Sequence, residues 1–245
     1  MVIAPYFTEY RVFIEGAGGE VIETPAADRT FLLDIDAIER SLSPRVKALL
    51  INSPNNPSGV VYPKENLEAL GELLRCKSAE YGHPIYLISD EPYREVVYDG
   101  VTVPWVPHCY GDTLVCYSYS KAVSLPGERI GYVLVPPTME DHDTVYQAMA
   151  GAARCTSHIN APSLFQQVAA ACDGMVSDLT TYVLCGEPRS AVRQPRRHGL
   201  RVRAARRDLL PAHALAGAGC RGLQRAGQGA GPSVPRHEQL RLPRL

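Results

Sequence analysis

Three polar groups of complementary chemistry follow apolar, strand-like runs in this sequence. Asn52 to Asn56 follow RVKALLI, Asp90 follows PIYLIS, and Lys121 follows TLVCYSYS. In open α/β sheets ligands bind beyond the carboxyl ends of the strands, so we expect these groups at one edge of a sheet. The amine is the most informative, because the sequence has four lysines against twenty-one arginines. A low-dielectric position disfavours the charged form of an amine and so supplies a neutral nucleophile.

Each group also has an ordinary structural explanation. The segment NSPNNPSG can be a turn of Pro, Asn and Gly, Asp90 can cap a helix, and Lys121 can extend its ammonium group to solvent. Any one of these explanations is acceptable alone. All three at one edge of one sheet favour a functional site instead.

Periodicity predicts the elements that must position these residues. We expect strands over residues 20–26, 45–54, 84–93, 112–121 and 130–137, and helices over residues 8–19, 34–43, 63–82, 138–153 and 162–179. Asp34 is a plausible N-cap, Pro63 stands near the start of the third helix, and Gly82 stands past its end. Continuous apolar strands separated by an amphipathic helix predict the α/β class, with a mostly parallel central sheet and helices on both faces.

Composition predicts a soluble globular protein. The 245 residues are 45% hydrophobic with a net charge of −1, enough for one sizeable core. No apolar run approaches the about 18 residues of a membrane span, and MVIAPYFTEY lacks the basic start and apolar run of a signal peptide. We therefore expect a cytoplasmic protein with no membrane partner. The seven cysteines are scattered, with no zinc-ligand spacing, so we expect free thiols and no metal.

The charge reverses sign near the end of the chain. Residues 186–245 hold 13 Arg and three acids and carry +10, whereas residues 1–185 hold 12 basic and 23 acidic side chains and carry −11. The last sixty residues also lack Ile, Phe, Tyr, Trp, Met, Thr, Asn and Lys. They therefore have little with which to fill a core.

Three interpretations of this basic segment are open. It can bind nucleic acid through phosphates, but no aromatic residue is interleaved for base stacking. It can be a native disordered tail. Enrichment in residues with GC-rich codons favours a third interpretation, out-of-frame translation of a GC-rich gene. We therefore expect a first domain over residues 1–182 and a frameshifted or disordered Arg/Gly/Pro/Ala-rich segment over residues 183–245, and we expect no nucleic-acid partner.

Four motifs in order, NNPSG, SDEPY, SYSK and GERIGY, resemble the signatures of a known family. The sequence is similar to the class I/II aminotransferases, the aspartate-aminotransferase-like fold-type-I enzymes that use pyridoxal 5′-phosphate. The usual first motif is NPTG, so Ser58 stands in place of threonine. The resemblance covers roughly residues 1–180, and four ordered motifs are more specific than any single one. It implies the large cofactor-binding domain of such an enzyme.

The resemblance implies catalytic roles for three residues. Lys121 would form the Schiff base with the cofactor aldehyde and then move the proton between the substrate Cα and the cofactor. Asp90 would pair with the pyridinium nitrogen and keep it protonated. Tyr93, together with Asn56, would hydrogen-bond the phenolic oxygen of the cofactor.

The resemblance also assigns the rest of the cofactor site. Ser118 and Arg129 would hold the phosphate, since a guanidinium matches phosphate oxygens in bidentate geometry. The alternative for Arg129 is a surface ion pair with Glu128 or Glu95. Phe7 would stack on the pyridine ring, with Tyr6 as the next choice, and a core aromatic is the ordinary alternative for either ring.

The implied function is amino transfer between an amino acid and a 2-oxo acid by a homodimer. Relative to the family, we expect the N-terminal part and the C-terminal small domain to be missing, so this chain can be inactive. A carbon–sulfur lyase or decarboxylase of the same fold stays open, because cofactor-binding residues do not decide which bond at Cα breaks. A non-catalytic remnant with a basic interaction tail is the third possibility.

Overall fold

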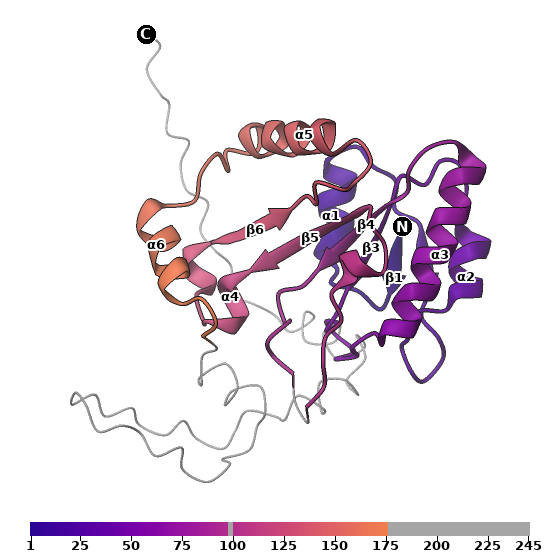
Figure 1. The fold of residues 1–245 in the computed structure, drawn as a ribbon, viewed down its shortest axis with the longest axis horizontal. Helices are drawn as coiled ribbons and strands as arrows, with labels where there is room; N and C mark the ends of the chain where they lie inside the picture. Colours follow the sequence, from indigo (N-terminus) through magenta and orange to yellow (C-terminus); the bar gives the residue numbers. More distant parts are fainter. Residues whose placement is uncertain (98–99, 176–245) are drawn as a thin grey trace, which may run out of the picture. The chain divides into compact units, whose positions relative to one another are not determined.

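The computed structural model describes residues 1–97 and 100–175. Within them, six strands form one sheet in the order β2-β1-β3-β4-β5-β6 (Figure 1). The strands are β1 (Val2–Ala4), β2 (Glu23–Pro25), β3 (Ala48–Asn52), β4 (Tyr86–Asp90), β5 (Thr113–Ser118) and β6 (Gly131–Leu134). The first five run parallel, and β6 runs antiparallel to β5. The predicted mostly parallel α/β sheet is confirmed.

Helices connect the strands. They are α1 (Glu9–Gly16), α2 (Ile35–Ser41), α3 (Lys64–Tyr81), α4 (Tyr119–Ala122), α5 (His142–Cys155) and α6 (Ser163–Ala171), with 3₁₀ turns η1 (Val106–His108) and η2 (Pro126–Glu128). The predicted caps are present. The Asp34 side chain accepts a hydrogen bond from the amide of Ala37 at 2.9 Å, and Gly82 ends α3 with φ 71°.

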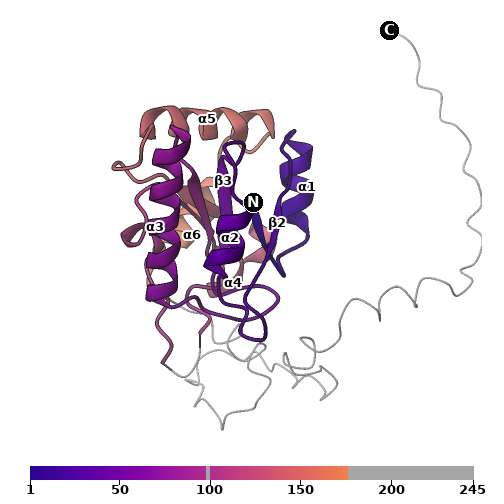
Figure 2. The ribbon, with the colours of Figure 1, turned by 90° about the vertical axis from the view of Figure 1, so that its right-hand side faces the viewer.

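Alternation along the strands gives the sheet two different faces. Leu49, Ile51 and Leu87 pack into the main core with apolar residues of α2 and α3. The α3 contribution is Leu67, Leu70 and Leu74, spaced as one helical face. Figure 2 shows α3 and α1 on opposite sides of the sheet. Helices therefore cover both faces, as predicted.

Two strand predictions needed correction. The sequence pattern missed β1, which has three residues and lies between β2 and β3 in the sheet, with Val2 fully buried. The strand predicted through Lys121 ends at Ser118, because the Ser118 hydroxyl accepts a hydrogen bond from the amide of Ser120 at 3.1 Å and caps α4. Lys121 therefore lies on a short helix and not on the strand.

Other predictions are only partly covered by the structure. The helix predicted over residues 162–179 forms as α6 but ends at Ala171 and is followed by a turn, whereas residues 176–179 and the segment 183–245 lie outside the described residues. No helix in the described part is long and apolar enough to span a membrane. The described cysteines, at 76, 109, 116, 155 and 172, are free.

Candidate functional site

The register of the sheet brings polar residues into one row at the carboxyl ends of the strands. Asn52 of β3 pairs with Asp90 of β4, and Asp90 pairs with Cys116 of β5. The Asn52 amide nitrogen donates to the Asp90 carbonyl oxygen at 2.8 Å, and its Oδ1 accepts from the backbone amide of Asn56 at 2.6 Å. Asn52 thus fixes the loop that carries Asn56 to the end of β4.

Asp90 is a half-buried carboxylate with a specific partner from α1. The hydroxyl of Tyr10, itself buried, donates a hydrogen bond to Asp90 Oδ2. Burial raises the pKa of Asp90, and the hydrogen bond from Tyr10 acts in the opposite direction. Burial, and then the charge of Asp90, raise the pKa of the neighbouring Cys116 thiol to about 12. The site is therefore a low-dielectric position in which this one carboxylate is stabilised by a phenol.

Lys121 lies beside the aromatic ring of Tyr93. The Lys121 Nζ atom is 5.5 Å from the centroid of that ring, within the range of a cation–π contact. Burial and then the charge of Asp90 raise the pKa of Tyr93, which follows Asp90 by three residues. Asn52, Asp90 and Lys121 therefore lie at the ends of neighbouring strands, at one edge of the sheet as the sequence predicted, and the phenol of Tyr93 lies beside the amine.

The predicted phosphate-binding pair is only partly assembled. Ser118 faces Gly131 across the ladder, and the amide of Tyr119 donates to the Ile130 carbonyl at 3.2 Å, so the backbone before β6 lies against the start of α4. The Arg129 side chain, however, is exposed, and its Nη1 donates to the Pro126 carbonyl at 2.9 Å.

Neither ion pair that stood as the alternative for Arg129 occurs in the described part of the chain. The ion pairs found there do not include Arg129 with Glu128 or Glu95, and Glu95 instead accepts a hydrogen bond from Tyr117 at 2.9 Å. The structure thus leaves the guanidinium on its own loop and does not direct it at Ser118.

The two candidate stacking rings both neighbour Tyr10. Phe7 is 38% exposed and stands edge-on to Tyr10, with centroids 5.6 Å apart. The Tyr6 ring is stacked with Tyr10 at 6.4 Å, and its hydroxyl donates to Glu23 at 2.5 Å. Tyr10 contacts both rings and donates a hydrogen bond to Asp90, so Tyr10 links each ring to the carboxylate.

Sequence reasoning missed Tyr10, and also Glu91 and Arg94 directly after the strand. In TEYRVFIE, Tyr10 reads as one of several apolar residues on a helix, so no local pattern marks its hydroxyl. Glu91 and Arg94 read as ordinary charged loop residues in DEPYRE, yet Glu91 is 1% exposed. The available signal in the sequence is the pair Asp90 and Glu91, two successive acids at the end of a buried strand.

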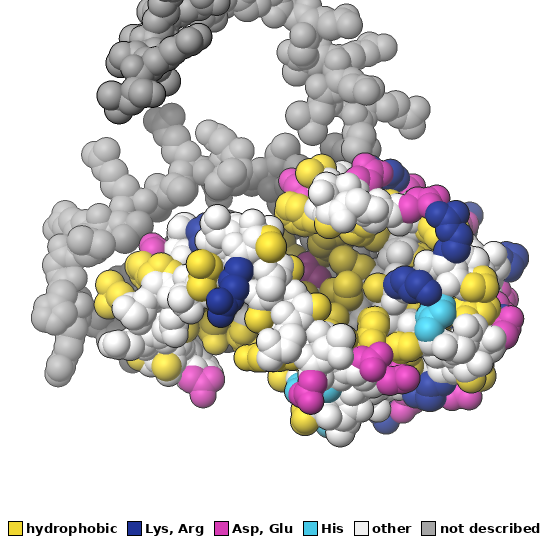
Figure 3. Space-filling view, turned by 90° about the horizontal axis from the view of Figure 1, so that it is seen from above, with side chains coloured by type: hydrophobic (Ala, Val, Ile, Leu, Met, Phe, Trp, Pro, Cys, Tyr) yellow, Lys and Arg dark blue, Asp and Glu magenta, His cyan; other side chains and the backbone are white. Residues whose placement is uncertain are grey.

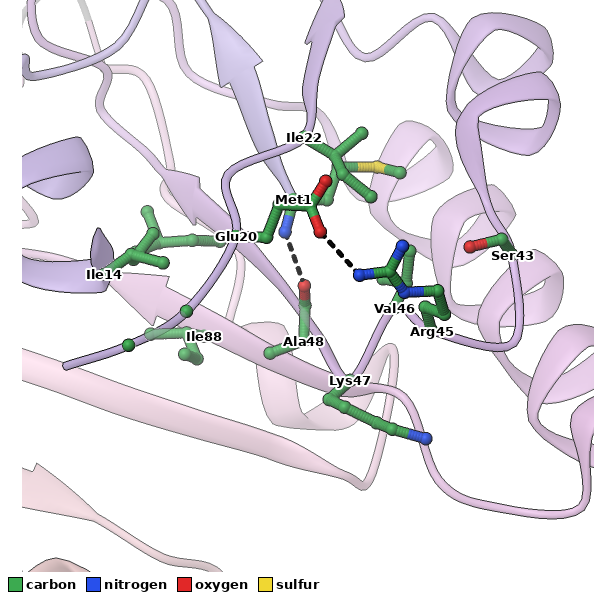
Figure 4. Close-up of a pocket in the computed structure, with 13 residues that line it drawn as sticks. Met1, Ile14, Glu20, Ile22, Ser43, Arg45, Val46, Lys47, Ala48 and Ile88 are labelled. Atoms are coloured by element: carbon green, nitrogen blue, oxygen red, sulfur yellow. Dashed lines mark hydrogen bonds and ion pairs between the residues drawn. The ribbon is translucent and has the colours of Figure 1, made fainter.

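The structure also contains a cavity of about 500 Å³ that is separate from these residues. It lies at the starts of β1 and β3, where the Met1 amino group donates to the Ala48 carbonyl at 2.8 Å and Arg45 pairs with Glu20 at 2.6 Å (Figure 4). The face in Figure 3 likewise shows hydrophobic side chains gathered in a hollow. None of the predicted site residues lines this cavity.

Comparisons with known proteins agree with this geometry. The family model for aminotransferase class I and II matches residues 1–179. A probable aspartate/prephenate aminotransferase from Thermus aquaticus is 38% identical over 137 residues, which are 56% of this chain and 34% of the relative. An amino transferase structure from Eubacterium rectale is 51% identical, with a TM-score of 0.72, over 74% of this chain and 46% of that one.

The structure of Thermus thermophilus aspartate aminotransferase (tetra mutant 1) is also similar. It is 36% identical with a TM-score of 0.55, over 64% of this chain and 40% of that one. The chain therefore spans about a third of the length of the curated relatives it matches and less than half of these solved structures.

Proposed function

The chain belongs to the aminotransferase class I and II family, and from this membership we propose that it forms part of a pyridoxal 5′-phosphate-dependent aminotransferase. The proposed reaction transfers an amino group between an amino acid and a 2-oxo acid. The observation that carries the proposal is the placing of Lys121 against Tyr93, at the sheet edge where Asp90 is half-buried.

The donor set fits this cofactor. When bound, pyridoxal phosphate supplies an aldehyde that bonds an amine and a ring that accepts the electron pair released at the substrate Cα. Asp90 suits the ring nitrogen, since Tyr10 occupies Oδ2 and the structure gives Oδ1 no hydrogen bond within the described residues. A carboxylate at that nitrogen keeps the nitrogen protonated. Asn56 and Tyr93 would donate to the phenolic oxygen of the ring.

Lys121 has two proposed tasks. Its amine attaches the cofactor, and after substrate displaces it the same amine removes and returns the proton at the substrate Cα. Phe7 would stack on the ring face. Ser118 and Arg129 would hold the phosphate, which requires the Arg129 side chain to leave the Pro126 carbonyl that it now bonds.

We further propose that the whole protein works as a homodimer with amino-acid and 2-oxo-acid substrates. The names of the relatives favour amino transfer over a carbon–sulfur lyase or a decarboxylase. The cytoplasmic location stays a prediction of the sequence.

The attachment residue gives the direct test. We would incubate the 245-residue chain with pyridoxal phosphate, reduce it with borohydride and locate the fixed pyridoxyl group by mass spectrometry. Four lysines, at 47, 64, 77 and 121, and the Met1 amino group compete, and peptide mapping distinguishes these five amines. We expect the label on Lys121 and its loss in Lys121→Ala.

The matched control is Lys47→Ala, which removes an exposed lysine near the starts of the strands. It should leave labelling of Lys121 unchanged. Labelling spread over all four lysines, or unchanged total labelling in Lys121→Ala, would contradict the proposed function of this site.

A further inference from the structure

Glu91 is a buried carboxylate at the start of the loop that follows β4. Only 1% of the residue is exposed. Its Oε1 accepts from the Ser89 hydroxyl at 2.7 Å, and its Oε2 accepts from Arg94 Nη1 at 2.6 Å. Burial raises the pKa of Glu91, while Ser89 and Arg94 oppose that rise. A buried charge of this kind is tolerated because it is paired and hydrogen-bonded.

Arg94 uses the rest of its guanidinium to join the two ends of the loop. Its Nη1 and Nη2 donate to the carbonyls of Pro104 and Val103, each at 3.2 Å. Its Cζ lies 5.1 Å from the centroid of the Trp105 ring. A planar fork with five donors can make these contacts together, whereas a lysine ammonium is a single point charge.

Tyr93 lies between Glu91 and Arg94 in the sequence. Before it, the Glu91 amide donates to the Cys116 carbonyl of β5 at 2.8 Å, and after it, the Val96 amide donates to the Tyr93 carbonyl at 2.8 Å. The Tyr93 ring lies against Lys121. The backbone before Tyr93 is thus bonded to the sheet, and the backbone after it is held by the Val96 turn and by the Arg94 amide, which donates to the Glu91 carbonyl at 3.3 Å.

We propose that Arg94 is a positioning residue: by joining the buried Glu91 to the carbonyls of Val103 and Pro104, it holds the Tyr93 ring against Lys121. Arg94 acts through Tyr93. The consequence of Arg94 for catalysis rests on the proposed function, in which Tyr93 contacts the cofactor. The contacts of Arg94 with Glu91, Val103 and Pro104 do not depend on any cofactor.

The first test uses the 245-residue chain without cofactor. Arg94→Lys keeps a positive charge beside Glu91 but loses the fork. We expect hydrogen–deuterium exchange over residues 91–97 to become about tenfold faster. Trp105, the single tryptophan, should shift its fluorescence emission to the red. Arg75→Lys is the matched control, because Arg75 also bonds a carboxylate three residues away and a carbonyl, but on an exposed helix face.

A second variant covers the case in which Arg94→Lys does not fold. Glu91→Gln with Arg94→Met removes the pair together and leaves no buried unpaired charge. Wild-type exchange over residues 91–97 and wild-type Trp105 emission, in whichever of the two variants folds, would overturn the proposal.

The second test asks whether Arg94 acts through Tyr93. We would measure the rate at which pyridoxal phosphate becomes fixable on Lys121 in Arg94→Lys, in Tyr93→Ala and in the double variant. We expect each single variant to be slower, by roughly tenfold, and the double variant to be no slower than Tyr93→Ala. Multiplied rate losses in the double variant would overturn the assignment. If the wild-type chain takes up no cofactor, the proposed function fails, and the exchange measurement still decides the role of Arg94.

Discussion

At the scale of single residues, Asp90 is held between two opposing influences. Burial favours its neutral form, while the hydroxyl of Tyr10 donates to the carboxylate and favours the anion. The proposed role needs the anion, because only a carboxylate keeps a ring nitrogen protonated. Tyr10 therefore favours the ionised form that the proposed role needs and that burial alone would disfavour.

Removing the Tyr10 hydroxyl tests this balance. In Tyr10→Phe the pKa of Asp90 should rise further, because the hydrogen bond that lowers it is gone. We expect kcat/KM to fall by roughly tenfold, the usual worth of a hydrogen bond to a charged group, and the acidic limb of its pH profile to move to higher pH. Tyr117→Phe is the control, since it removes a hydroxyl that donates to the exposed Glu95. An unmoved acidic limb in Tyr10→Phe would contradict this role.

Replacing Asp90 by Asn should separate function from stability. The folded pKa of Asp90 is raised above its ordinary value of 3.8, so its stabilising contribution is full below 3.8 and is lost as the pH rises through the folded pKa. At neutral pH the wild type carries a half-buried anion that asparagine avoids. We expect Asp90→Asn to lower kcat by roughly 10²-fold or more and to raise Tm by about 2 °C at neutral pH.

Thermal unfolding across a pH series checks the sign of that effect. The Tm difference between Asp90→Asn and wild type should shrink as the pH falls and should vanish below 3.8, where the aspartate is protonated in both the folded and the unfolded state. A less stable variant at neutral pH would show that the carboxylate stabilises the fold, and a difference that is constant with pH would show that ionisation of Asp90 does not cause it.

At the scale of elements, α3 and η1 approach each other closely at Gly71. A Cβ atom added there would lie 2.5 Å from the Cys109 carbonyl oxygen, a backbone atom that cannot move cheaply. We expect Gly71→Ala to lower the free energy of unfolding by about 1–3 kcal/mol, the usual cost of overpacking. Gly151→Ala is the matched control within α5, where an added Cβ meets nothing within 4 Å. It should be neutral or stabilising by about 0.5–1 kcal/mol. Chemical denaturation measures both.

The elements that the sequence predicted well are those with a complete local signal. In α3 the apolar spacing, Pro63 before the helix and Gly82 after it all agree. β1 has too few residues to show a period, and its place between β2 and β3 depends on pairing with residues about 20 and 50 positions away. The strand before Lys121 was predicted too long because a serine cap, and not hydrophobicity, ends it.

The candidate site divides in the same way. The placement of Asp90, Tyr93 and Lys121 at one sheet edge was predictable, because each stands at or just after the end of a strand and parallel strands end at one edge, whereas their roles at a cofactor stay a prediction. Tyr10 comes from a helix 80 positions before Asp90, so only the fold could bring the two together. The Arg129 side chain depends on a local loop conformation, with φ 52°, that the motif GERIGY does not determine.

At the scale of the whole molecule, the two parts of the chain differ in charge and in likeness to known proteins. The family match covers residues 1–179, within the part that carries −11, and the excess of +10 lies in residues 186–245. Every residue proposed for the site lies in the matched part. The basic segment is thus the one feature that favours the non-catalytic alternative with an interaction tail.

Binding to nucleic acid distinguishes that alternative from the proposed enzyme. Thirteen arginines can contact phosphates, but the rest of the chain is acidic and the basic segment has no aromatic residue for stacking on bases. We therefore expect weak, sequence-independent binding that falls by roughly 10³-fold or more between about 50 and 200 mM salt.

Fluorescence anisotropy with two unrelated labelled duplexes measures the affinity, and the same sample is assayed for pyridoxal phosphate on Lys121. Tight binding to one duplex at 200 mM salt, without any cofactor uptake, would favour an interaction protein. Loss of DNA binding with added salt would show that the arginines make only nonspecific phosphate contacts. Together with labelling of Lys121, that result would assign the chain to amino-group chemistry.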